Sequence, residues 1–226
     1  PGAGGGTGAA RSAAAGAVEH DRLVELAAER VPAAADRAAP VPPPAPGTAT
    51  PGRRFERKDT EQYHVCLGGE GLSRHDDRRF ALRVLDTIFG GTTSSRLFQE
   101  VRERRGLAYA VYSFTSAYQD AGQVGLYVGT RADSLTEALS VVGAELQRLA
   151  VDPATAEELD RAKENLKGRI VLSLESTGAR MNRLGSEVLA GGPLLSLDEV
   201  VARIEAVTLD DLCLLYTSPS PRDRQK

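Results

Sequence analysis

Arg102 and Tyr109 are the residues whose types and spacing best fit a functional site. Arg102 lies in the last turn of a predicted helix that ends at Gly106, and Tyr109 opens the strand that follows. Their polar tips would therefore converge at one helix-to-strand corner. A structural role is the alternative, because Arg102 also belongs to a charged run, residues 102–105, of the kind that is favourable near a helix C-terminus. Spacing alone leaves both interpretations open.

The stretch from residue 92 to residue 131 must position this pair. A hydroxyl cluster, Thr93, Ser94 and Ser95, is predicted to cap the helix by accepting a hydrogen bond from a free backbone amide. We interpret these serines as caps and not as nucleophiles, since no histidine base lies nearby in the sequence. Two alternating strands then follow, joined by a short turn at residues 118–120.

The elements around this unit predict an α+β fold. Tyr63, Val65 and Leu67 alternate with polar neighbours, as in a strand with one buried face. Residues 78–89 carry an apolar helical stripe of four residues: Phe80, Val84, Leu85 and Ile88. Start signals predict three more helices: Ser134 with Glu137, Asp152 with Pro153, and Ser196 with Glu199. Because locally paired strands precede a block of helices, we expect an antiparallel sheet covered by helices on one face.

Composition and charge limit the class of protein. The chain has 226 residues, 41% of them hydrophobic, which is enough for one or two ordinary domains. No run approaches the roughly 18 to 20 apolar residues of a membrane span, and the first residues lack a signal-peptide pattern. Acidic and basic residues interleave at a net charge of −3, which argues against a nucleic-acid partner. We expect a cytoplasmic protein, with export left open because the chain begins at Pro1.

The sequence divides into four segments. Residues 1–32 include an amphipathic helix, residues 33–52 form a proline-rich linker, and residues 53–212 form the main domain. Residues 213–226, CLLYTSPSPRDRQK, resemble a translated sequencing adapter, since the helical pattern stops and a Ser/Pro-rich run begins. We exclude this tail from fold reasoning as an artefact. Cys66 is then the single cysteine, so no internal disulfide is expected.

Two motifs carry a resemblance to a known family. GGTTSSRLFQEVRERRGLAYAVYSF and the downstream ARMNRLGSE resemble the C-terminal half of pitrilysin/insulinase-type zinc peptidases, of the mitochondrial-processing-peptidase-like branch. The resemblance covers about residues 53–212. AAAGAVEHDRLVELAAERV also resembles the final strand and helix of the preceding, metal-binding half. The chain would then be truncated at both ends, with residues 33–52 as the linker between the two halves.

The resemblance implies an enzyme whose metal lies outside this chain. Members of this family close two similar halves around an extended peptide, and zinc sits in the N-terminal half. The H-x-x-E-H motif that binds and uses this zinc is absent here. His20, His64 and His75 each lack a glutamate at the required spacing, so we expect no metal ligands among them. The fragment should therefore be inactive alone.

The same resemblance gives the arginine and the tyrosine a role. It implies that Arg102 and Tyr109 reach across the closed chamber to hydrogen-bond the substrate carbonyl and the developing oxyanion. The expected partners are an extended peptide or unfolded protein, the missing N-terminal half, and a second subunit in a homo- or heterodimer. Two alternatives stay open: a non-catalytic paralogue that serves a peptidase complex as a substrate-binding or structural subunit, and a module that binds peptides at an exposed strand edge.

Overall fold

The computed structural model describes residues 12–30 and 51–217 of the chain. These residues fall into two compact units: Pro1–Arg53 with Leu172–Leu194, and Arg54–Val171 with Leu195–Lys226. The smaller unit contains α1 (His20–Arg30) and α5 (Thr177–Leu189). The larger unit contains the sheet and the candidate site.

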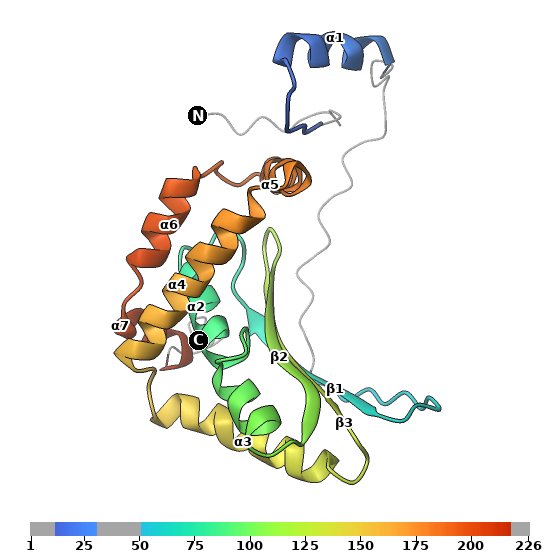
Figure 1. The fold of residues 1–226 in the computed structure, drawn as a ribbon, viewed down its shortest axis with the longest axis vertical. Helices are drawn as coiled ribbons and strands as arrows, with labels where there is room; N and C mark the ends of the chain where they lie inside the picture. Colours follow the sequence, from blue (N-terminus) through green and yellow to red (C-terminus); the bar gives the residue numbers. More distant parts are fainter. Residues whose placement is uncertain (1–11, 31–50, 218–226) are drawn as a thin grey trace. The chain divides into compact units, whose positions relative to one another are not determined.

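The sheet of the larger unit is antiparallel and has three strands in the order β1-β3-β2 (Figure 1). The strands are β1 (Tyr63–Gly71), β2 (Ala108–Ala117) and β3 (Gly122–Thr130). Val65, Val128 and Val111 form one row across them, and the last two are buried at 0% and 3% exposure. Residues on the other face, such as Cys66 and Tyr112, are exposed. Helices therefore cover one face, as the sequence pattern predicts.

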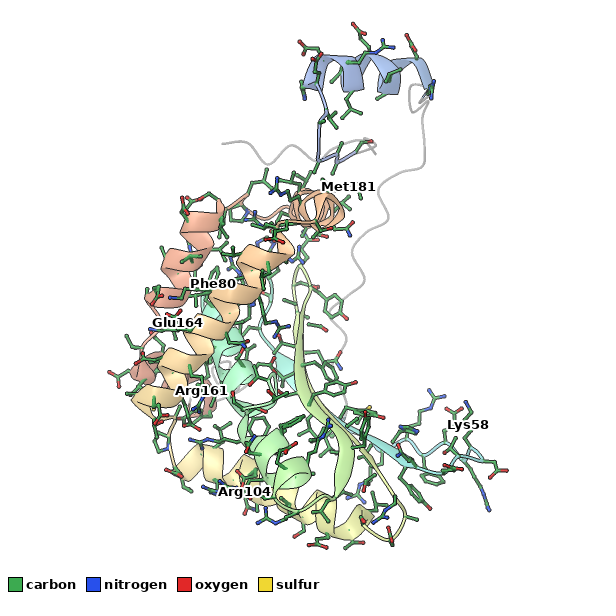
Figure 2. The ribbon with its side chains drawn as sticks, viewed as in Figure 1. Lys58, Phe80, Arg104, Arg161, Glu164 and Met181 are labelled. Atoms are coloured by element: carbon green, nitrogen blue, oxygen red, sulfur yellow. The ribbon has the colours of Figure 1, made fainter. Side chains whose placement is uncertain are left out.

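The helices of the larger unit bury their apolar stripes in one core, in which some contact the inner face and others pack on those helices. They are α2 (Arg79–Phe89), η1 (Phe98–Glu103), α3 (Leu135–Val151), α4 (Ala156–Ser173), α6 (Leu197–Glu205) and α7 (Leu209–Thr217). The whole predicted stripe of α2 is buried: Phe80, Val84, Leu85 and Ile88. Arg79 and Arg203 pack against the ring of Phe80, which Figure 2 labels. These observations confirm the α+β fold with an antiparallel sheet.

The first strand differs from the expectation of one buried face. Tyr63 and Leu67 are 44% and 43% exposed, and Val65 is only half-buried. The reason is that β1 pairs with β3 alone in the described part of the chain, so it forms an edge of the sheet. Beside it, an open apolar cavity of about 480 Å³ separates Leu67 from Leu82 and Phe89 of α2.

Two of the predicted helix caps are wrong. The Ser134 hydroxyl bonds the neighbouring Asp133 carboxylate and does not cap α3. Asp152 ends α3 instead of starting α4. The cap of α4 comes from Thr155, whose hydroxyl accepts from the Glu158 amide while the Glu158 carboxylate accepts from the Thr155 amide.

The capping box of α6 is confirmed, because Ser196 and Glu199 exchange the two expected hydrogen bonds.

The structure also bears on the chain's outer segments. α7 continues to Thr217, so the helix does not stop at residue 212, and both Leu215 and Tyr216 pack against the core. Residues 12–19 precede α1 without forming the strand that the sequence suggests. Residues 31–50, which hold nearly all of the predicted linker, lie outside the described residues. Among the helices described, none combines the length and apolar character of a membrane span.

Candidate functional site

Arg102 projects from a helix that is fixed by its buried neighbours. Leu97 and Val101 are fully buried, which holds this helix against the core. From Phe98 to Glu103 the helix has π geometry, with the Arg104 amide bonding the Gln99 carbonyl at 2.9 Å, five residues back. Such widened turns are rare and occur frequently at functional sites.

The helix that contains η1 ends at Gly106, as predicted, but its closing hydrogen bonds span more residues than usual. Gly106 adopts φ +61°, the left-handed conformation that favours glycine after a helix. Its amide donates to the Arg102 carbonyl at 3.0 Å, and the Leu107 amide donates to the Val101 carbonyl at 2.9 Å. Each of these bonds spans one residue more than in an ordinary Schellman ending, which matches the π turn before it.

The start of η1 corrects the predicted hydroxyl cap. Ser95 is 1% exposed, and its Oγ has no hydrogen-bond partner among the described residues. Ser94 Oγ lies 3.2 Å from Thr92 Oγ1. The side chain of Gln99 binds this segment instead, since its Nε2 donates to the Thr93 carbonyl at 2.8 Å. Ser95, just before the helix, is therefore buried without acting as a cap.

Tyr109 occupies an irregularity of the sheet. Ala108 pairs with Thr130 and Ala110 pairs with Gly129, so Tyr109 is an extra residue without a partner in the register. Leu107 and Ala108, just before it, are buried, and Thr130 Oγ1 donates to the Leu107 carbonyl at 2.5 Å. The backbone is thus anchored on the core side, while the Tyr109 side chain remains 76% exposed. Bulges of this kind re-aim a side chain next to active sites.

The structure brings Arg102 and Tyr109 into direct contact. The guanidinium carbon of Arg102 lies 4.7 Å from the centre of the Tyr109 ring and 4.8 Å from that of Phe98. Its nearest carboxylate is Glu103, with Nε 3.8 Å from Oε1. Within residues 12–30 and 51–217, neither Arg102 nor Tyr109 makes a side-chain hydrogen bond. The donors of the guanidinium and the phenol thus have no side-chain acceptor among these residues, and a cation–π contact holds the two groups together.

An aromatic row lies on the helix-free face of the sheet, beyond Ala110. The imidazole Nδ1 of His64 is 2.5 Å from the Tyr127 hydroxyl. The ring of Tyr127 stacks on that of Tyr112 at 5.0 Å, and Tyr112 in turn lies 6.3 Å from Phe114. We call these four residues the aromatic row. His64 is therefore part of a ring cluster and not a strand residue among polar neighbours only.

Gly125 allows the aromatic row to lie flat on the sheet. A methyl group at Gly125 would overlap the ring of Phe114, which crosses above the glycine from the paired position on β2. The Phe114 ring thus covers β3 at Gly125, in the space that a side chain at this position would otherwise fill. The result is a surface of aromatic side-chain rings on this face of the sheet.

The described residues do not fit a metal. Among residues 12–30 and 51–217, no three His, Cys, Asp or Glu side chains converge on one position. His64 is engaged with Tyr127, and His20 lies in α1 of the smaller unit. No step that uses zinc can be assigned to these side chains.

Glu100 is the residue of the site that sequence reasoning missed. It is 7% exposed, and its carboxylate pairs with Arg104 and Arg105. The hydrogen bond from Arg105 holds the pKa of the Glu100 carboxyl below its usual value, although burial opposes this shift. The signal that could have found it is its position one residue before Val101, on the buried side of the helix.

Comparison with known proteins places the chain among peptidases. Residues 9–166 match the family model described as the peptidase M16 inactive domain. An uncharacterized zinc protease of Streptomyces coelicolor is 44% identical over 211 residues, which cover 88% of this chain and 45% of that protein. The uncharacterized zinc protease YmxG of Bacillus subtilis is 44% identical over 154 residues, or 68% of this chain and 38% of YmxG.

Solved structures agree with the sequence match. The peptidase M16 inactive domain from Pseudomonas fluorescens superimposes with a TM-score of 0.64 at 28% identity, covering 73% of this chain and 39% of that one. The chain spans less than half the length of these relatives. The resemblance read from the motifs is thereby confirmed at the level of the family. The chain belongs to the M16 peptidase family and corresponds to its inactive domain.

Proposed function

We propose that this chain is the substrate-binding half of a zinc-dependent endopeptidase whose metal lies in the other half. Two observations support this. Its relatives carry the name zinc protease, and the chain spans only 45% of the Streptomyces protein and 38% of the Bacillus protein. The residues described here offer no metal cluster of their own. On this proposal, the metal-bearing half belongs to the part of the relatives that this chain does not cover.

The contact between Arg102 and Tyr109 carries the proposal. A peptide carbonyl gains negative charge in the transition state of hydrolysis, and fixed donors stabilise that charge. The Arg102 guanidinium and the Tyr109 hydroxyl are two such donors. They belong to side chains in direct contact, since the guanidinium carbon lies 4.7 Å from the centre of the Tyr109 ring. Both lie at backbone irregularities, and neither makes a side-chain hydrogen bond within the described residues. Their task is to bind the carbonyl oxygen of the scissile bond.

The aromatic row provides a surface for the rest of the peptide. It begins beyond Ala110, which follows Tyr109 on β2, and crosses all three strands of the helix-free face. The Tyr112 ring is 46% exposed, so it can contact apolar side chains of an extended peptide. The substrate would lie along this face, with its scissile carbonyl at the corner.

The test compares the full-length protein with its metal-bearing half alone, using a quenched fluorescent peptide and metal analysis. We expect one zinc ion per full-length chain, and loss of turnover when either the zinc or this half is removed. Equal turnover by the metal-bearing half alone would refute the substrate-binding role. Absence of zinc from the full-length protein would instead support a non-catalytic subunit.

A further inference from the structure

Glu100 is a buried carboxylate that pairs with some of the neighbouring arginines and not with others. Three arginines occur within four residues: Arg102, Arg104 and Arg105. Glu100 Oε1 pairs with Arg104 and Glu100 Oε2 pairs with Arg105. Arg105 donates a further hydrogen bond to the Glu100 backbone carbonyl at 3.0 Å. Two of the three guanidinium groups are therefore held on one side of the helix end.

Arg102 is the arginine that this arrangement leaves for the site. Its guanidinium packs against the rings of Phe98 and Tyr109, and its Nε stays 3.8 Å from the exposed Glu103 carboxylate. If Glu100 were neutral, Arg104 and Arg105, which lie within three residues of Arg102, would lose the partner of their ion pairs (Arg104 is labelled in Figure 2). They could then compete with Arg102 for the aromatic faces, because every guanidinium stacks on rings in the same way.

The other end of the helix is fixed separately. Arg96 donates to both carboxylate oxygens of Glu158, at 2.7 and 2.8 Å, and to the carbonyls of Asp152 and Pro153. This contact anchors the first turn, but it lies six residues before Arg102. Glu100 acts on the turn that carries Arg102 itself. Burying a charge is costly unless it is paired, and Arg104 and Arg105 supply this pairing for Glu100.

We propose that Glu100 is a positioning residue for Arg102. By holding Arg104 and Arg105, its carboxylate keeps the Arg102 guanidinium on Tyr109 and aimed at the substrate carbonyl. Glu100 itself touches no substrate. The inference rests on the proposed function for its catalytic consequence, while its geometric part can be tested on the chain alone.

The first experiment measures the Tyr109 ring directly. NMR spectra of the 226-residue chain with labelled tyrosine and arginine would report the Tyr109 ring signals and the Arg102 Nε–H signal. We expect Glu100→Gln to shift the Tyr109 ring signals toward their positions in Arg102→Ala. The Arg102 Nε–H signal should shift toward its position in Tyr109→Ala, because each alanine variant removes one member of the stacked pair. Glu103→Gln is the matched control, because it removes an equal charge from an exposed position beside Arg102. Unchanged Tyr109 signals in Glu100→Gln would overturn the inference.

A second variant protects the test against misfolding. Arg104→Gln combined with Arg105→Gln changes side chains that are 66% and 42% exposed and leaves the apolar core unaltered, and thermal unfolding checks that the variant remains folded. The Glu100 carboxylate then lacks its partners and should draw Arg102 away from Tyr109. The same shift of the Tyr109 signals is expected as in Glu100→Gln. If the double variant keeps the wild-type Tyr109 signals, the inference fails.

The second experiment measures turnover by the full-length protein. We expect Glu100→Gln to lower kcat by about tenfold to a hundredfold with little change in KM, since it displaces a donor used in the transition state. Glu103→Gln should retain wild-type kcat. If Glu100→Gln shifts the Tyr109 signals but Arg102→Ala leaves kcat unchanged, the proposed function fails while the geometric part of the inference stands.

Discussion

The guanidinium carbon of Arg102 lies 4.7 Å from the centre of the Tyr109 ring, although seven positions of the sequence separate the two residues. Two local irregularities make this contact possible: the π turn in η1 and the bulge that inserts Tyr109 into β2. Between them, Leu107 and Ala108 anchor the backbone in the core. A rigid base thus carries two exposed, donor-bearing side chains.

Replacement of Tyr109 by phenylalanine removes the hydroxyl and keeps the ring, so it tests the contribution of the hydroxyl alone. The ring would still stack with Arg102, so folding and peptide binding should persist. If the hydroxyl donates to the developing oxyanion, kcat should fall by about tenfold to a thousandfold, and more than KM rises. Steady-state kinetics of the full-length protein measure this. Tyr118→Phe, at an exposed position between β2 and β3, is the control, and an unchanged kcat in Tyr109→Phe would exclude the hydroxyl from the reaction.

Replacement of Arg102 by lysine keeps the charge but removes the planar guanidinium. An ammonium group presents no fixed pair of donors and stacks less well, so the two groups would no longer be held in one geometry. We expect kcat/KM to fall by at least about tenfold. Arg131→Lys is the control, because the Arg131 side chain is 71% exposed and forms an ion pair with Asp133 at 3.5 Å, outside the Arg102–Tyr109 contact. Equal kcat/KM values for both variants would show that charge alone suffices.

Much of this site follows from sequence patterns, and the rest does not, for physical reasons. Alternation and helical spacing locate β2, β3 and the helix before Gly106, because these signals are local. The π turn leaves no such signal, since it depends on how Leu97 and Val101 fit the core. The sequence also does not show that Ser95 is buried without a hydrogen-bond partner for its hydroxyl. The position of Glu100 before Val101 is a weak signal, and the three-dimensional fold is needed to show that it pairs with Arg104 and Arg105.

Truncation of Tyr112 tests the path of the substrate. Its ring lies in the aromatic row on the helix-free face and is 46% exposed. We expect Tyr112→Ala to raise KM for a peptide with apolar side chains by about fivefold, the equivalent of roughly 1 kcal/mol of lost aromatic contact. Tyr63→Ala is a closely matched control, since Tyr63 is 44% exposed and lies on the opposite face. If both variants raise KM equally, the aromatic row does not bind the peptide.

The ion pair between Arg96 and Glu158 makes a prediction about stability and its pH dependence. Both side chains are largely buried, at 12% and 17% exposure, and Arg96 also bonds two backbone carbonyls. Arg96→Ala leaves the Glu158 carboxylate and those carbonyls without this partner. We expect the free energy of unfolding in urea at pH 7 to fall by about 2 to 4 kcal/mol.

The hydrogen bond from Arg96 holds the pKa of Glu158 below its ordinary value of 4.5. A carboxyl with a lowered folded-state pKa contributes stability above its unfolded pKa and loses it as the pH falls through the folded value. The difference between wild type and Arg96→Ala should therefore be constant above about pH 5.5 and shrink below pH 4.5. Arg161→Ala, which breaks an exposed pair with Glu157 at 3.5 Å, should cost less than about 1 kcal/mol. A difference for Arg96→Ala that does not change between pH 7 and pH 3 would show that the ionised carboxylate contributes nothing, and that the four hydrogen bonds act as neutral contacts.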